Sequence, residues 1–338
     1  MMEMKKTLLA ALTVFGCTTA AQAATPVNIC VFDLLGKSGE MFDVMKSWEL
    51  QAKQWGAQIN LIARTDEANL DNDFKAGKCD GVVMTAMRAR PYNKFAGSID
   101  ALGGVPDNEV AKRAISFALD QRNAAKMTTT LGAKKYEVAG IVPVGSAFVF
   151  VRDKSINTIE KAAGKKFAVL NYDDAQKNMV ESIGAQAVMS DVSNFVSKFN
   201  NGAVDMVGSP AYAFKPLEIE KGIKANGGMF NFPVLHVTVD FVIHSDKFPA
   251  GFAQKSRDWF AGNLPAAFSK IKALEAGIPA KYKINLAADA KSDYQKKLRD
   301  ARISMTKKGI YDKEMMAVLK RARCSVDKAN FECSLKDE

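Results

Sequence analysis

The sequence has few of the residues and patterns on which most enzymes depend. It contains only two histidines, His236 and His244, and on one strand they would lie roughly 26 Å apart, too far to share a metal ion. GxSxG, P-loop, HExxH and CxxC patterns do not occur. We therefore expect no enzymatic activity, no metal site and no cofactor.

Long hydrophobic runs are also scarce. The apolar run from Leu8 to Phe15 follows Lys5 and Lys6, and it is shorter than the roughly 18 residues that a membrane helix needs. Small residues at Ala21 and Ala23 match the positions that signal peptidase reads. The pattern predicts a signal peptide over residues 1–23 that is cleaved during export to the periplasm.

A second processing site is possible at Val14-Phe15-Gly16-Cys17, and it would leave a lipid on Cys17. Phe15 is too bulky for that pattern, so we favour cleavage before Ala24. No later stretch is long and apolar enough for a membrane helix. We therefore do not expect a channel or a pump.

Positive charge is abundant. The 47 Lys and Arg residues outnumber the 37 Asp and Glu residues, which gives a net charge of +10. No continuous basic run with interleaved aromatic residues occurs, so we expect no nucleic-acid partner. An exported basic protein is suited to anionic solutes or to an anionic membrane surface.

Cysteine usage agrees with an oxidising compartment. Cleavage before Ala24 leaves Cys30, Cys79, Cys324 and Cys333, an even number. Cys30 lies in one predicted strand and Cys79 immediately precedes another, so neighbouring strands would bring them together. Cys324 and Cys333 are close in sequence, which makes loop closure easy. We expect these two disulfides, with buried free thiols as the alternative.

Short β-branched runs alternate with helical stretches, as is typical of parallel α/β layers. One such block covers residues 27–87 and a second covers 146–207. A helix, a glycine, an aspartate and a strand follow one another at 74–82 and again at 199–207. The repetition predicts two lobes built on one plan.

The rest of the chain returns to the first lobe. A valine-rich strand is expected at 234–244, and four helical stretches are expected at 249–261, 264–275, 292–307 and 313–323. We predict a first lobe from residues 24–145 and 241–338, including the C-terminal helices, and a second lobe from 146–240. The chain crossings near 142–151 and 237–244 would form the hinge.

The sequence resembles the type II periplasmic solute-binding proteins, and most closely the DctP-like receptors of TRAP transporters. The resemblance extends from about Asn28 to Lys307 and is carried by Ser155 to Phe167, by 182–188 and by Phe199 to Val207. It implies an α/β, two-lobed type II periplasmic-binding-protein fold with a hinge of crossing strands. A divergent group with this likeness includes members described as RND efflux components.

One position departs from the family pattern. The family has an arginine two residues after the second lysine of Gly164-Lys165-Lys166, where its guanidinium pairs with a ligand carboxylate. Here that residue is Ala168. The family's preference for acidic ligands is therefore not carried over, and Lys37, Arg88 and Arg90 are the candidates to meet an anionic group.

Ligands of open α/β sheets bind beyond the carboxyl ends of strands. The loops at these positions offer backbone NH groups, guanidinium groups, phenols and hydroxyls. Turn chemistry and surface packing are the alternatives for most of these residues, whereas Asp240 is a charged residue inside an apolar strand and needs a partner. The predicted ligand-binding residues are Lys37, Ser38, Arg88, Arg90, Tyr92, Asn171, Tyr172, Ser209, Tyr212 and Asp240.

These features predict an exported receptor that captures a small organic solute between its lobes and delivers it to the subunits of a membrane transporter. The alternative is an accessory or scaffold component of an envelope efflux complex that binds no ligand. Closure of the lobes around a solute would distinguish the two.

Overall fold

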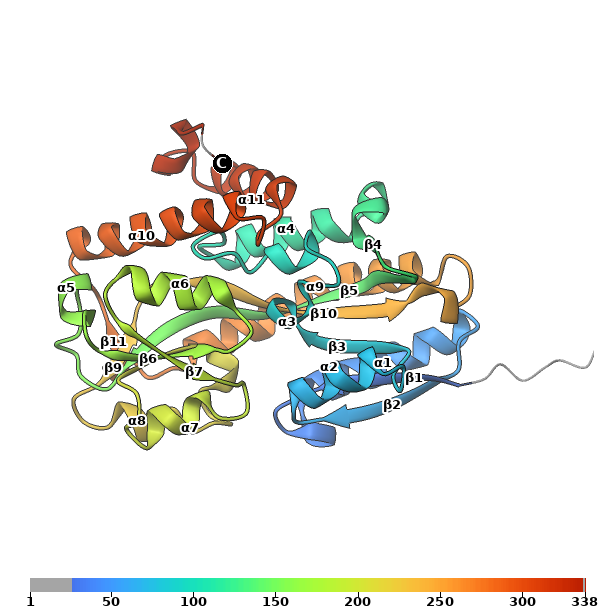
Figure 1. The fold of residues 1–338 in the computed structure, drawn as a ribbon, viewed down its shortest axis with the longest axis horizontal. Coiled ribbons are helices and arrows are strands. Elements are labelled where there is room, and N and C mark those ends of the chain that lie inside the picture. Colours follow the sequence, from blue (N-terminus) through green and yellow to red (C-terminus); the bar gives the residue numbers. More distant parts are fainter. Residues whose placement is uncertain (1–25, 337) are drawn as a thin grey trace, which may run out of the picture.

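The computed structural model describes residues 26–336 and 338. The predicted signal peptide, the cleavage site before Ala24 and Cys17 lie outside the described residues. Two α/β lobes stand side by side, and C-terminal helices pack over both (Figure 1). We call the part with β1–β3 and α1–α3 the first lobe and the part with β6–β8 and α5–α8 the second lobe.

The strands are β1 (Val27–Phe32), β2 (Ile59–Arg64), β3 (Gly81–Thr85), β4 (Thr128–Leu131), β5 (Lys134–Val151), β6 (Lys166–Leu170), β7 (Gln186–Ser190), β8 (Met206–Pro210), β9 (Gly228–Phe230), β10 (Leu235–His244) and β11 (Lys283–Ile284). The helices are α1 (Glu40–Gln54), α2 (Glu67–Lys75), α3 (Ala86–Ala89), α4 (Asn108–Leu119), α5 (Ile159–Ala162), α6 (Asp174–Ser182), α7 (Phe195–Asn200), α8 (Glu220–Ile223), α9 (Phe252–Ala276), α10 (Ala288–Lys307) and α11 (Lys313–Val326). Short 3-10 helices lie at Gly36–Ser38, Ala96–Ser98, Gln121–Met127, Ala211–Ala213, Ser245–Lys247, Ala280–Tyr282 and Phe331–Ser334.

One sheet passes through both lobes in the order β2-β1-β3-β10-β5-β8-β6-β7. The outer three strands of each lobe are parallel, which confirms the two βαβ blocks predicted from the sequence. β10 runs antiparallel to β3, and β5 runs antiparallel to β8. The two halves of the sheet therefore have the same plan, joined through the β5–β10 pair.

The repeated helix-glycine-aspartate-strand pattern has the same hydrogen bonds in both lobes. Asp80 Oδ2 accepts from Asn28 N at 2.9 Å, and Asp205 Oδ2 accepts from Lys166 N at 2.9 Å. In each case the amide of the aspartate donates in return to the carbonyl of the same residue. Each aspartate thus fixes the start of the central strand of its lobe.

The long strands β5 and β10 form the hinge. They pair from Leu235↔Ala147 to His244↔Tyr136, with an irregularity between Val237 and Thr238. Gly145 lies at that irregularity with φ 121°, a conformation that favours glycine. The sequence predicted β5 only from residue 146, because residues 134–137 are largely polar and Gly140, Pro143 and Gly145 interrupt the buried apolar run that follows.

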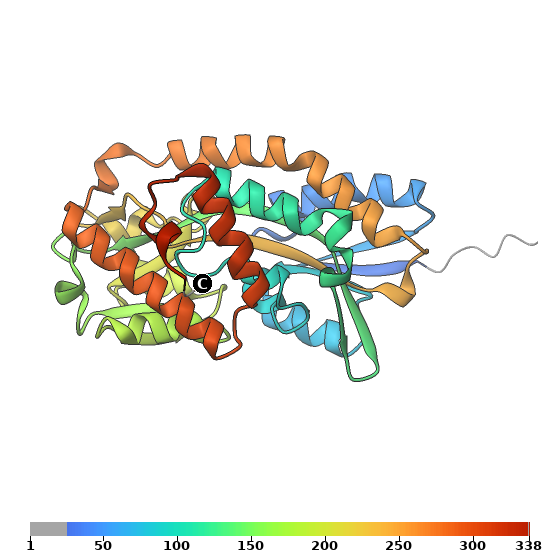
Figure 2. The same cartoon turned by 90° about the horizontal axis from the view of Figure 1, so that it is seen from above.

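The C-terminal helices cover both lobes. The stretches predicted as separate helices at 249–261 and 264–275 form one helix, α9, which runs along much of the molecule (Figure 2). Pro265 is exposed within it, so water can satisfy the carbonyl that loses its partner. No helix of residues 26–336 combines the length and the apolar character needed to cross a membrane.

The C-terminal tail, which was predicted to belong to the first lobe, contacts both lobes. α10 packs against α6 of the second lobe, whereas α11 packs against α4. The sequence does not reveal which lobe each helix covers, because both helices are amphipathic and their apolar faces fit either surface.

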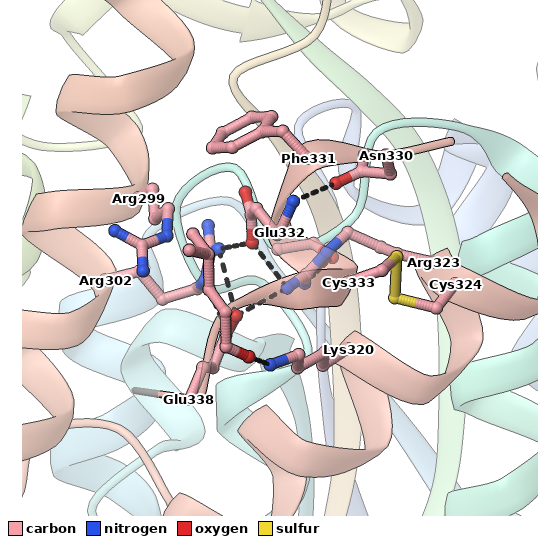
Figure 3. Close-up of polar contacts among 12 residues, drawn as sticks. Arg299, Arg302, Lys320, Arg323, Cys324, Asn330, Phe331, Glu332, Cys333 and Glu338 are labelled. Atoms are coloured by element: carbon pink, nitrogen blue, oxygen red, sulfur yellow. Dashed lines mark hydrogen bonds and ion pairs between the residues drawn. A yellow bond between two sulfur atoms is a disulfide. The ribbon is translucent and has the colours of Figure 1, made fainter. Parts of the chain in front are cut away.

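A buried charge network fixes the C-terminus to these helices (Figure 3). Arg302 of α10 and Arg323 of α11 both pair with Glu332 and Glu338. The same guanidinium groups donate at 2.7 Å to the carbonyls of Leu102 and Gly104. The network therefore holds α10, α11 and the 102–104 loop in one arrangement.

Both predicted disulfides are confirmed. Cys30 of β1 is bonded to Cys79, which lies just before β3, and their Cα atoms are 5.8 Å apart. Cys324 of α11 is bonded to Cys333 in the tail, with Cα atoms 5.7 Å apart. The first bond crosslinks neighbouring parallel strands, and the second holds the tail next to its charge network.

Candidate functional site

A cavity of about 280 Å³ lies between the lobes and against the hinge strands. The first lobe contributes the end of β1 and the start of α1, and the second lobe contributes β6 and α6. Alternate residues of β10 face it at Leu235, Val237 and Val239, as the period of a strand requires. A molecule in this cavity would contact both lobes and the hinge.

The cavity wall is almost entirely apolar. Valine, leucine, isoleucine, methionine, phenylalanine and alanine side chains form most of it, and no arginine or histidine occurs among its lining residues. The polar members of the wall are Asp33, Glu40, Thr85, Gln176, Tyr212, Lys270 and Tyr294. A wall of this composition offers dispersion contacts and few electrostatic anchors.

The charged groups of the wall are already engaged by the protein. The Asp33 carboxylate accepts hydrogen bonds from the amides of Leu35 at 2.9 Å and Met41 at 2.7 Å, so it fixes the start of α1. Glu40 and Lys270 form an ion pair at 3.0 Å, with side chains 43% and 57% exposed. Lys270 is thus the one lysine of the lining, and its charge is shared with a carboxylate at the solvent side.

Ala168 lies in the cavity wall on β6. It is in register with Val188 of β7 and Val207 of β8, and it is 4% exposed. The position that the resemblance assigns to a ligand-binding arginine is therefore in the cavity, but it presents only a methyl group.

Arg88 connects the two lobes outside the cavity. Its Nε is 3.1 Å from Glu67 Oε2, and its Nη2 is 3.2 Å from Asp191 Oδ2 beyond β7. The guanidinium lies over the ring of Tyr172, with Cζ 3.7 Å from the ring centroid, and the Tyr172 hydroxyl donates to Glu67 at 2.8 Å. Three groups from the two lobes therefore surround one guanidinium.

Arg90 makes a second connection. Its Nη2 is 2.6 Å from Asp100 Oδ1, its Nη1 is 3.3 Å from Asp173 Oδ1, and its Nε donates to Gly97 O at 2.7 Å. Asp173 also caps α6 of the second lobe. We call the Arg88 and Arg90 contacts to the second lobe the interlobe clasp.

Glu67 and Asp240 are buried carboxyl groups near these contacts. Burial raises the pKa of Glu67, although Arg88 and the amide of Thr85 oppose the shift. Burial, and then the nearby Asp100, raise the pKa of Asp240 well above its usual value. Neither oxygen of Asp240 has a hydrogen-bond partner within the described part of the chain, and the raised pKa favours the neutral form of its carboxyl.

The structure places the other predicted ligand residues as follows. Tyr212 lines the cavity, and burial and the adjacent Asp33 raise its pKa. Lys37, Ser38 and Asn171 are exposed and do not line it.

The remaining predicted residues are buried or engaged elsewhere. Ser209 is buried behind the wall, whereas Tyr92 donates to Asp71 within a cluster of aromatic rings. Arg88, Arg90, Tyr172 and Asp240 also lie outside the lining.

Glu67 beside the interlobe clasp and Tyr294 in the cavity wall are among the residues that were not predicted from the sequence. Glu67 has the sequence signal of an ordinary acidic residue in the first turn of a helix, and only the tertiary structure shows its contact to Tyr172. Tyr294 is in the middle of α10, yet it lines the cavity, and its buried hydroxyl has no partner among the residues that the structure describes. Nothing in its local sequence distinguishes it from a packing tyrosine.

The fold, with its cavity between two lobes, matches that of solved TRAP periplasmic solute-binding proteins. A TRAP periplasmic solute-binding protein from Desulfovibrio salexigens with bound orotic acid has a TM-score of 0.70 at 12% identity, over 89% of this chain and 99% of that one. One from Haemophilus influenzae RdAW with bound L-gulonate has a TM-score of 0.71 at 11% identity, over 88% and 99%. The predicted fold class is confirmed.

The chain belongs to the AdeT1/2 family of solute-binding proteins. The family model "Solute-binding protein AdeT 1/2" matches residues 51–338. "Probable solute-binding protein AdeT1" of Acinetobacter baumannii is 44% identical over 308 residues, which cover 91% of this chain and all of that protein. "Probable solute-binding protein AdeT2" of the same organism is 28% identical over 239 residues, 71% of this chain and 99% of that protein.

Proposed function

We propose that this protein is a periplasmic receptor that captures a small organic solute in its interlobe cavity and delivers it to a membrane transporter. The observation that carries the proposal is the composition of the cavity wall from both lobes and the hinge. A solute that contacts both lobes lowers the free energy of the closed arrangement, and closure is the change that a transporter can read.

The interlobe clasp supports the same mechanism. Arg88 and Arg90 of the first lobe pair with Asp191 and Asp173 of the second, so the closed arrangement is partly stabilised by the protein's own charges. A solute then needs to supply only the remaining free energy of closure. The AdeT1/2 membership fits a solute receptor. The predicted boundaries at 24–145, 146–240 and 241–338 would give it two moving bodies, with α10 packed on the second lobe.

Ligand-induced closure tests the proposal. Thermal unfolding and small-angle scattering would be measured with a set of carboxylates, amino acids and neutral metabolites. We expect at least one compound to raise the melting temperature and to reduce the radius of gyration of the protein, because closure brings the lobes together.

The matched variants are Ala168→Phe, which fills the cavity, and Ala266→Phe on the exposed surface of α9. Only Ala168→Phe should abolish both effects. A folded wild-type protein that responds to no compound would contradict solute capture and favour an accessory role in an envelope efflux complex.

A further inference from the structure

We propose that the solute is an uncharged molecule with a mainly hydrocarbon body and one hydrogen-bonding group, rather than a carboxylate. This inference rests on the proposed function and names the chemical class that the cavity takes. Apolar side chains from the second lobe, the hinge and α9 line the cavity, among them Phe167, Val169, Met179, Ile183, Val237 and Leu274.

The charges of the wall oppose an anion. Asp33 is 2% exposed and accepts backbone hydrogen bonds from Leu35, Met41 and Phe42, which leaves a fixed negative group beside the cavity. The lysine of the wall, Lys270, is paired with Glu40. A buried carboxylate without a cationic partner is strongly disfavoured, because it loses its hydration and gains no counter-charge.

The protein's nearby guanidinium groups cannot supply that counter-charge. Arg88 is held by Glu67 and Asp191, and Arg90 is held by Asp100 and Asp173. Neither side chain lines the cavity. Withdrawing either one would leave two carboxylates without their partner, so recruitment of an arginine by an anionic solute would also break the interlobe clasp.

Two residues of the lining, Thr85 and Tyr294, have a hydroxyl without a hydrogen-bond partner in the described part of the chain, and Tyr294 is our candidate to orient a solute. Tyr294 lines the cavity and is 7% exposed. Its hydroxyl has no hydrogen-bond partner in the described part of the chain. Burial raises the pKa of this hydroxyl, so it stays protonated and can both donate and accept. A buried hydroxyl without a partner is costly. A rotation of the Tyr294 side chain that brings this hydroxyl to the cavity would let a hydroxyl, carbonyl or amide of the solute satisfy it.

The volume bounds the size of the solute. An apolar cavity of about 150 Å³ binds benzene in a well-studied engineered protein, and the cavity here is about 280 Å³. It therefore suits a body about twice the size of benzene, such as a bicyclic aromatic compound or a terpenoid alcohol of about ten carbon atoms.

Calorimetry with matched probes tests the charge preference. We would titrate the whole mature protein with 2-naphthalenemethanol and with 2-naphthoate, which share a ring system and differ in charge. The alcohol should bind at least about tenfold more tightly, since only the carboxylate loses its hydration without a counter-charge. Tighter binding of 2-naphthoate, succinate or malate than of the alcohol would overturn this inference and leave the proposed receptor function intact.

Two substitutions sharpen the test. Tyr294→Phe should weaken the alcohol by about tenfold and leave naphthalene unchanged, because it removes only the free hydroxyl. Equal weakening of both probes would refute the role of the hydroxyl. Ala168→Arg should reverse the preference toward 2-naphthoate, whereas Ala266→Arg on the exposed face of α9 should not.

The failure of the proposed function gives a different result. If the folded protein binds neither naphthalene probe, nor any member of the wider set used for the closure measurement, solute capture itself fails and this inference fails with it. Circular dichroism and the melting temperature of each variant show whether the fold is kept, and Tyr294→Phe supplies a conservative reading if Ala168→Arg does not fold.

Discussion

We expect the interlobe clasp to set how readily the cavity opens, and Asp191→Asn isolates the contribution of its Arg88–Asp191 pair. The substitution keeps the shape of the side chain and the oxygen that accepts from Ser193 N at 3.3 Å, but it removes the charge 3.2 Å from Arg88. The two side chains are 10% and 14% exposed, so screening by solvent is small. A hydrogen bond between charged groups contributes about 1.5–3 kcal/mol. We expect the open form to gain at least about tenfold in population relative to the closed form.

Small-angle scattering and hydrogen exchange measure this change without a ligand. The radius of gyration should increase, and amides of α3 and of residues 171–173 should exchange faster, because these segments carry the clasp. Glu109→Gln is the matched control, since the Glu109–Arg113 pair is exposed and lies within a single helix. An Asp191→Asn protein with the scattering and exchange of the wild type would refute the idea that the Arg88–Asp191 pair holds the lobes together.

Three further predictions concern stability. The raised pKa of Asp240 means that the folded state favours the neutral form of its carboxyl. Stability is therefore lost as the pH rises above the usual pKa of 3.8. Asp240→Asn should raise the melting temperature at pH 8, with no gain below about pH 4. Replacing Cys324 and Cys333 by serine should lower the free energy of unfolding in urea by about 2–4 kcal/mol, whereas an unchanged value would show that the charge network alone holds the tail. A Cβ at Gly140 would lie 2.2 Å from the Phe260 ring, so Gly140→Ala should cost about 1–3 kcal/mol in urea unfolding, whereas Gly262→Ala, with open space around it, should stabilise α9 by about 0.5–1 kcal/mol.

The fold could be predicted because its signals are local. Strands β1, β6 and β7 are short apolar runs between turn residues, and the glycines at 77 and 202 end helices with positive φ in both lobes. The first half of β5 could not be found in this way. It pairs with β10, a strand far along the chain, and that pairing makes a strand of a sequence that Gly140, Pro143 and Gly145 interrupt.

The candidate site was harder to predict, because its walls look like ordinary core. Val237 and Val239 face the cavity, whereas Val242 is packed in the interior, and no sequence pattern separates the two. The polar residues that follow strands were sought as ligand contacts, yet Arg90 pairs with Asp173, 83 residues away. The alanine at position 168 was the one signal in the sequence that indicated a cavity without a guanidinium.

The position of β10 in the sheet has a consequence for the order of folding. The strands β5, β8, β6 and β7 come from one continuous stretch of chain. β3, in contrast, can complete its pairing only after β10, which contributes the pair Val239↔Thr85. Closing such a long loop is slow, and the chain is synthesised from its N-terminus. The edge of β3 is therefore exposed while the second lobe is already complete, and an unpaired edge can join another chain. During refolding, amides of β6 and β8 should gain protection from exchange before those of β3.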